Sequence, residues 1–274
     1  MSATAQARLP FVSLSWLSEY RELLLTMLRR ELRVKYKGSV LGIVWSYVYP
    51  LAMMGVYTLV FSVLLRAVSI PHYSLYVLLG LAVWSFFQAA VQMGTSSIVA
   101  NANLVRNVWF PRELIPLAIV LAQAFSTLIM FIVLVPIDLA IVPRAASTFL
   151  LAIPFLLGLL LLATGLSWIL ATANVFFRDV EHLMGVLFLP WFFLTPVLYS
   201  LDGVPGAAAH STVIHVLRYA NPVTPYLEGI RGAMLEGRVP GVVLLVYTAL
   251  VGPAIAVVGL RLIQRYADRF AVEV

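Results

Sequence analysis

The chain of 274 residues is too apolar for a soluble protein, because 62% of its residues are hydrophobic and only 11% are charged. A soluble domain carries about 45–50% apolar and about 25% charged residues. Together with a mean hydropathy of +0.98, this composition indicates a membrane protein and excludes soluble enzymes and nucleic-acid-binding domains. The absence of cysteine excludes a disulfide framework, a thiolate zinc site and a cysteine nucleophile. The net charge of +6 therefore bears on membrane orientation.

The first predicted element is an amphipathic helix over residues 14–37, in a cytoplasmic amino-terminal segment spanning residues 1–38. Its apolar face would hold Trp16, Tyr20, Leu24, Met27, Leu28 and Leu32. Its polar face would hold Glu22, Thr26, Arg29, Arg30, Arg33 and Lys37. Glu31 and Lys35 have the spacing of a favourable i, i+4 pair. Such a helix lies in the membrane interface, where its basic face binds anionic lipid or docks a cytoplasmic partner.

Long apolar runs then predict six membrane-spanning helices and an all-α fold. About 20 apolar residues cross a roughly 30 Å hydrocarbon layer, and runs that do not alternate with period two exclude barrel strands. The predicted spans are residues 39–65, 73–99, 114–142, 147–173, 183–200 and 241–260. These spans make up a transmembrane domain over residues 39–260, which a cytoplasmic tail (261–274) follows.

Prolines fall in nearly every predicted span and would kink the helices: Pro50, Pro116, Pro136, Pro154, Pro190, Pro196 and Pro253. The stretch that follows the fifth span, residues 201–238, is too polar to cross the membrane and too apolar for an ordinary solvent loop. We expect short helices that dip into the membrane face, with an ordinary folded loop as the alternative.

The distribution of basic residues orients the chain. With six spans both termini share one side, and 13 of the 18 Lys and Arg residues fall on that side. The positive-inside rule therefore predicts cytoplasmic termini.

The sequence offers no internal source of energy for transport. An ionisable group near the bilayer centre would indicate proton or ion coupling, and the only charge in the six spans, Asp138, lies near a helix end. The two lysines do not stand in a phosphate-binding G-x-x-x-x-G-K-[ST] motif. If the protein pumps a substrate, another chain must bind ATP. A passive channel would need no such drive, but a carboxylate ring or carbonyl filter is not evident.

Five segments, in this order, resemble a known family: the amphipathic amino-terminal helix, KYKGSVLGIVWSYVYP, NANLVRNVWFPRELIP, NVFFRDVEH and NPVTPYLEGIRGAML. The chain resembles the permease subunit of ABC-2 type exporters, closest to those that export lipid-linked polysaccharides such as O-antigen, or teichoic acids. The resemblance implies a homodimer in the bacterial cytoplasmic membrane, bound to two separate ATPase subunits. It implies no cofactor in this chain, since the partner subunits would bind ATP and Mg²⁺.

The resemblance also implies roles for charged and aromatic loop residues. The loop between the second and third spans would be the coupling helix that enters the ATPase, capped by Asn101 or Asn103. Its expected contact residues are Asn103, Val105, Arg106, Val108, Trp109, Phe110, Arg112 and Glu113. An interfacial connecting loop is the alternative. Arg178, Asp179 and Glu181 would form a second cytoplasmic contact or a salt-bridged gate hinge, or else merely hold the span in register.

Aromatic side chains are candidates for a glycan path, because sugar rings stack on aromatic faces. We expect seven of them to line a pore: Trp45, Tyr49, Tyr57, Phe61, Phe188, Trp191 and Phe192. Core packing or an interface belt is the alternative for each. Two copies would pair through their first and fifth spans, with Gly38 and Gly42 as a close-approach motif. Glu228 and Arg231, three residues apart, could pair in an outer gate or simply stabilise the outer helices.

Two further functions stay open at this point. An ABC-2 exporter of a drug or a lipid is the nearer one. A membrane enzyme acting on polyprenyl-phosphate sugars is the other, since Asp179, Glu181 and His182 could do metal or base chemistry at the membrane surface.

Overall fold

The computed structural model describes residues 19–38, 42–64, 70–203 and 211–274. Within these ranges the secondary structure is helical and holds no β-strand, which confirms the predicted all-α class. Residues 14–18 of the predicted amphipathic helix, and residues 39–41 and 65 of the first predicted span, lie outside the described residues.

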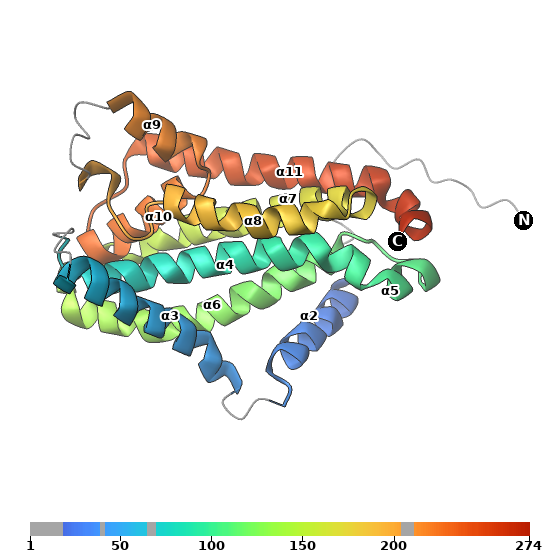
Figure 1. Ribbon diagram of the computed structural model, residues 1–274, viewed down its shortest axis with the longest axis horizontal. Helices are drawn as coiled ribbons and strands as arrows, with labels where there is room; N and C mark the ends of the chain where they lie inside the picture. The colour runs from blue at the N-terminus through green and yellow to red at the C-terminus, as the bar shows by residue number, and fades with distance from the viewer. Residues whose placement is uncertain (1–18, 39–41, 65–69, 204–210) are drawn as a thin grey trace, which may run out of the picture.

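Four long helices run side by side through the centre of the protein: α4 (Tyr73–Ala100), α6 (Leu114–Ile141), α7 (Ala152–Phe176) and α11 (Val242–Glu273) (Figure 1). Two further helices, α3 (Trp45–Tyr57) and α8 (Asp179–Leu194), pack beside α4. A 3-10 turn (Gly42–Val44) precedes α3, and a π-helical turn (Thr58–Leu64) extends it. The amino-terminal helix α2 (Arg21–Tyr36) packs on α6.

Short helices mark the two ends of the bundle. At the α5 end, α5 (Ala102–Asn107) lies near the carboxy terminus (Figure 1). At the opposite end, here called the α9 end, lie α9 (Ser211–Ala220) and α10 (Thr224–Arg231). Four shorter turns complete the fold: Pro143–Ser147, Phe149–Leu151, Leu201–Gly203 and Gly232–Glu236. Region 201–238 is thus helical over most of its described residues, so an ordinary loop is the wrong description of it.

Among the described residues, five helical segments are long and apolar enough to cross a membrane: Tyr47–Leu64, Tyr73–Ala100, Leu114–Ile141, Phe149–Phe176 and Val242–Glu273. The chain is therefore a multi-pass membrane protein. The predicted fifth span differs, because α8 has 16 residues and would cover only about 24 Å at ~1.5 Å per residue. At the end of the chain, α11 runs without a break to Glu273, so the boundary predicted at residue 260 is not a helix end.

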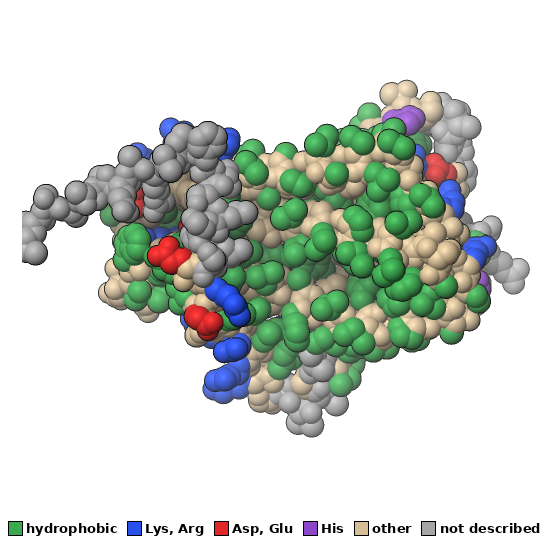
Figure 2. Space-filling view, turned by 180° about the vertical axis from the view of Figure 1, so that it is seen from behind, with side chains coloured by type: hydrophobic (Ala, Val, Ile, Leu, Met, Phe, Trp, Pro, Cys, Tyr) green, Lys and Arg blue, Asp and Glu red, His purple; other side chains and the backbone are tan. Residues whose placement is uncertain are grey.

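The surface has the character of a membrane protein. Figure 2 shows hydrophobic side chains across the middle of one face, while most of the charged side chains in view gather toward the two ends. Few side chains of α3 and its π-helical extension are buried: only 6% of residues 47–64 are buried, and the rest of those described are half-buried or exposed. Lipid, or another membrane-embedded surface, must cover such helices.

Glycines bring α7 and α11 into close contact. A Cβ atom on Gly252 would meet the carbonyl oxygen of Gly158, and one on Gly259 would meet that of Gly165. Small residues permit this approach of two helix backbones, which replaces hydrophobic burial as a source of association in a membrane. The four glycines therefore fix α11 to the centre of the bundle.

The expected role of proline and glycine in the spans needs correction. Pro116 and Pro154 stand in the first turn of α6 and α7, where a missing N–H breaks no helical hydrogen bond. Pro196 lies beyond the end of α8. Gly38 and Gly42 have φ angles of 76° and 50°, which lie outside the right-handed helical region, so they do not form a helix–helix contact motif.

Candidate functional site

The connection between α4 and α6, residues 101–113, contains α5 and is here called the α5 loop. It exposes only half of the predicted coupling residues. Trp109 is 72% exposed and Val108 48%, and Asn103 and Arg106 are also on the surface. An exposed tryptophan beside an arginine is the composition that anchors many protein interfaces. The loop therefore presents a compact surface at the α5 end, made of Asn103, Arg106, Val108 and Trp109.

The other four predicted contacts are buried, so their assignment to a partner surface is wrong. Val105 and Phe110 pack in an apolar cluster with Leu24 and Ile98. The Arg112 guanidinium, also buried, donates to the carbonyl oxygen of Phe110 at 3.3 Å.

Glu113 is held by two helices. Its carbonyl oxygen accepts a hydrogen bond from the Trp168 indole at 2.9 Å, and its carboxylate accepts one from the Gln264 amide at 2.9 Å. Asn101 occupies the predicted N-cap position of α5, but its side chain makes no capping hydrogen bond and donates instead to the carbonyl oxygen of Ser97. These contacts anchor the exposed half of the loop to α4, α7 and α11.

At the start of α8, Arg178 and Asp179 are exposed and Glu181 is half-buried. Among the described residues, no ion pair involves Arg178, Asp179 or Glu181, so the salt-bridged hinge is wrong. The Glu181 N–H instead donates to the Asn174 side chain at 3.1 Å. A second surface contact, the other prediction for these residues, stays open.

The amino-terminal helix α2 packs against the protein as well as facing outward. Leu24 is buried in the same cluster as Val105, with Tyr20 and Met27 beside it, as the apolar face predicts. Its basic residues are exposed: Arg29, Arg30, Arg33 and Lys37.

Lys35 does not pair with Glu31. Its ammonium donates to Gln123 Oε1 at 2.7 Å and to Ser126 Oγ at 2.9 Å, both on α6. Burial lowers the pKa of the Lys35 ammonium, against an opposing effect of Tyr36. The interaction was missed because its partners stand 88 and 91 residues away; the only sequence signal was that Lys35 is one of two lysines in the chain.

The predicted pore aromatics separate into two groups. Phe188 and Phe192 are buried against Trp84 of α4, with ring centres 6.2 and 5.6 Å away, and Trp191 lies 5.2 Å from Phe87. Phe188 and Phe192 therefore do not line a surface of the protomer, because α8 turns them into the bundle.

The aromatic residues of α3 differ. Trp45 is 55% exposed and Tyr49 is 59% exposed, and both line a cavity of about 400 Å³ between α2, α3, α4 and α6. Farther along the chain, Tyr57 stacks on Phe192 at 6.2 Å and Phe61 lies 6.3 Å from Tyr57.

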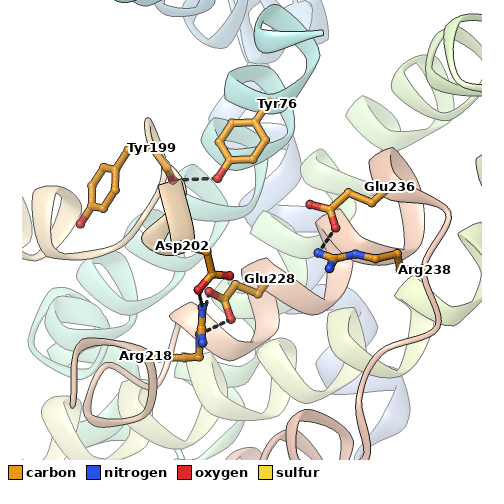
Figure 3. A network of polar contacts seen from close by, with 7 residues as sticks. All are labelled: Tyr76, Tyr199, Asp202, Arg218, Glu228, Glu236 and Arg238. Carbon is orange, nitrogen blue, oxygen red and sulfur yellow. Dashed lines mark hydrogen bonds and ion pairs between the residues drawn. The ribbon is translucent and has the colours of Figure 1, made fainter. Parts of the chain in front are cut away.

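At the α9 end, the predicted Glu228–Arg231 pair is wrong. Glu228 binds Arg218 at 2.9 Å, and Arg218 also binds Asp202 at 2.8 Å (Figure 3). Burial raises the pKa of the Glu228 carboxyl, although Arg218 opposes this shift. Burial alone would lower the pKa of Arg218, but its hydrogen bond to Asp202 and the charge of Glu228 raise it.

Arg231 is buried and binds backbone instead. Its guanidinium donates to the carbonyl oxygens of Tyr76 and Val197 at 3.0 and 2.6 Å, and also to that of Pro196. Arg231, Arg218 and Glu228 line a cavity of about 260 Å³. Glu236 and Arg238, which form a further ion pair (Figure 3), also border it. Opposite charges within 201–238 were the available signal for the Asp202–Arg218–Glu228 cluster.

Comparison with known proteins identifies the family. Residues 22–235 match the ABC-2 type transporter family. The chain belongs to this family. As a member of the ABC-2 type transporters, it is a transport permease, which confirms the resemblance drawn from its motifs.

Named ABC-2 relatives resemble the chain over most of its length. It is 31% identical to the O-antigen export system permease protein RfbA of Myxococcus xanthus. The 224 matched residues cover 82% of this chain and 84% of the relative. Two O-antigen export system permease proteins RfbA of Klebsiella pneumoniae are 29% and 28% identical, each covering 91% of this chain and 94% of the relative.

Proposed function

We propose that this ABC-2 permease is the membrane half of an ATP-driven exporter that moves a lipid-linked polysaccharide across the bacterial cytoplasmic membrane. The observation that carries the proposal is the similarity over 91% of the chain to O-antigen export permeases. An O-antigen-like glycan is favoured over a teichoic acid because the relatives named above are all O-antigen export permeases.

A separate ATPase would supply the energy and bind ATP and Mg²⁺. The exposed residues of the α5 loop support a docking surface for it, since Val108 and Trp109 are apolar side chains held out at one end of the bundle. Arg178, Asp179 and Glu181 at the start of α8 would add a second contact at the same membrane side. The basic face of α2, with Arg29, Arg30, Arg33 and Lys37, would contact anionic lipid or the ATPase.

The proposed assembly is a homodimer with two ATPase subunits. Exposed apolar side chains on α3 and α8, among them Leu51, Val186 and Leu189, support pairing through these helices. Trp45 and Tyr49 would then face the path between the copies.

Six crossings with cytoplasmic termini fit this assembly. In this arrangement α8 and residues 195–200 together complete the fifth crossing, and 1–38, 39–260 and 261–274 are the cytoplasmic segment, the membrane domain and the tail. The exposed Arg261, Arg265 and Arg269 near the end of α11 support a cytoplasmic carboxy terminus. The helices at the α9 end would form the outer, re-entrant region.

Depletion of the chain in cells that otherwise carry the whole system tests this function. We expect a lipid-linked polysaccharide to accumulate inside the cell and the corresponding surface polymer to disappear, with both effects reversed by the wild-type chain. Accumulation of another lipid or of a drug, with surface polysaccharide unchanged, would favour the alternative ABC-2 exporters. Export by the reconstituted chain on an ion gradient, without an ATPase, would refute the proposal.

A further inference from the structure

The cavity between α2, α3, α4 and α6 has a cation on its wall: the Lys35 side chain is partly exposed, but its ammonium contacts α6, one of the apolar helices of the bundle. Lys35 Nζ reaches Gln123 and Ser126, the tenth and thirteenth residues of the 28-residue α6. At ~1.5 Å per residue these positions lie roughly 14 to 18 Å from the start of that helix. The sequences of the spans alone do not reveal this charge, because the lysine belongs to α2, a helix outside the spans.

The structure provides no carboxylate for this cation. All twelve Asp and Glu residues lie in the described ranges, and none of the ion pairs in those ranges involves Lys35. Its two hydrogen-bond acceptors, an amide oxygen and a hydroxyl, are neutral. An ammonium has three N–H donors, so one is left to point to a ligand. A cation that faces a cavity beside a membrane-spanning helix, with only neutral partners, is a candidate site for an anionic ligand.

The remaining walls of the cavity suit a phosphate that carries a sugar. Ser85, Gln123, Ser126 and Thr127 supply hydroxyl and amide groups, and Trp45 and Tyr49 supply exposed aromatic faces. Lysine binds phosphate as a point charge, and aromatic rings stack on the apolar faces of sugars. The volume of about 400 Å³ lies in the range of small-ligand sites.

We propose that this cavity binds the phosphate of a lipid-linked glycan, with Lys35 on the phosphate and Trp45 and Tyr49 against the first sugar. This inference rests on the proposed function and adds to it the site that holds the substrate headgroup.

A binding assay on the full-length chain in phosphatidylcholine nanodiscs tests the site. The probe is a radiolabelled polyprenyl diphosphate that carries one N-acetylglucosamine. Lys35→Gln removes the charge and should weaken binding about tenfold or more, the value of one charged hydrogen bond. Lys35→Arg should stay within about threefold of wild type. Arg21→Gln, which removes one charge from the exposed start of the same helix, is the matched control and should bind as wild type does.

A second variant tests the sugar contact and keeps the proposal falsifiable if Lys35→Gln does not fold. Trp45 is exposed at the start of α3, so Trp45→Leu should leave the fold intact. It should weaken the sugar-bearing probe at least about threefold and leave sugarless polyprenyl diphosphate unchanged. Equal binding of the sugar-bearing probe by wild type and Trp45→Leu would overturn the proposal, as would equal binding by wild type and Lys35→Gln.

Competition distinguishes the sources of the phosphate. Unlabelled probe should displace the radiolabel, whereas phosphatidylglycerol in the nanodisc and inorganic diphosphate should not. Displacement by phosphatidylglycerol would make the cavity a phospholipid site, displacement by inorganic diphosphate would make it a free-anion site, and either result overturns the proposal. The assay contains neither ATPase nor ATP, so a failed site leaves the depletion experiment to decide the function separately.

Discussion

The guanidinium carbon of Arg231 lies 3.5 Å from the centre of the Tyr76 ring, and the same side chain donates to the Tyr76 carbonyl oxygen at 3.0 Å. One buried cation thus joins α10 to α4 and, through the carbonyl oxygen of Val197, to the chain that follows α8. Gly80 makes room for it, because a Cβ atom there would collide with Nη2 of Arg231. No carboxylate among the described residues forms an ion pair with Arg231.

Arg231→Lys should therefore destabilise the protein although it keeps the charge. Lysine lacks the planar fork that reaches several carbonyl oxygens at once, and each buried acceptor left unpaired costs about 1–3 kcal/mol. We expect a loss of at least about 2 kcal/mol in unfolding free energy, measured by thermal unfolding in detergent. Arg238→Lys, on a side chain that is 73% exposed, is the control and should change little. A stable Arg231→Lys variant would show that the three carbonyl contacts are dispensable.

The two halves of the α5 loop should respond differently to mutation. Arg106→Glu combined with Trp109→Ala removes exposed side chains, so folding and membrane insertion should be unchanged. Loss of an interface tryptophan typically costs at least about 2 kcal/mol, and co-purification of the ATPase should fall at least about tenfold. Unchanged co-purification would contradict docking at this loop.

Phe110→Ala is the matched comparison within the same loop. Phe110 is buried, and truncation of a buried phenylalanine costs about 3–5 kcal/mol. We expect a lower unfolding temperature in detergent, even when the ATPase is absent. If Phe110→Ala were as stable as wild type and lost only the ATPase, Phe110 would be a contact residue after all.

The glycines between α7 and α11 give a prediction about stability. Gly259→Ala places a methyl group against the backbone of Gly165, and overpacking of this kind costs about 1–3 kcal/mol. Gly185→Ala in α8 is the control, since a Cβ atom there meets nothing within 4 Å and alanine favours the helix by up to about 1 kcal/mol. Thermal unfolding should separate the two variants; equal stabilities would mean that α11 can move away from α7 without cost.

Glu228 predicts a pH dependence with a definite sign. Burial raises the pKa of its carboxyl in the folded state above the ordinary value of 4.5, so the folded state binds its proton more tightly than the unfolded state does. The contribution of this group to stability is fully present below pH 4.5 and is lost as the pH rises through the raised pKa. Glu228→Gln cannot titrate. The unfolding free energy of wild type minus that of this variant should therefore decrease as the pH rises from 4.5 through the raised pKa. An increase would indicate that Arg218 outweighs burial.

The sequence by itself determined the features that depend on local pattern. Apolar runs identified the membrane helices, because length and hydropathy alone decide whether a segment can lie in lipid. Helical spacing placed Tyr20, Leu24 and Met27 on one face of α2, and their packing in the protein agrees with this. The order of five short motifs was sufficient to indicate the ABC-2 family.

Only the tertiary structure decided which of these residues meet. Phe188 and Phe192 belong to a helix with apolar residues on all sides, so its sequence does not show which side faces the bundle. Their packing against Trp84 shows that these two rings point inward. Arg231 donates hydrogen bonds to backbone carbonyl oxygens up to 155 residues away instead of pairing with Glu228. Lys35, on the amino-terminal helix α2, contacts Gln123 and Ser126 of α6 because α2 packs against α6. Contacts between residues so distant in sequence depend on how whole helices pack, and no local spacing encodes that arrangement.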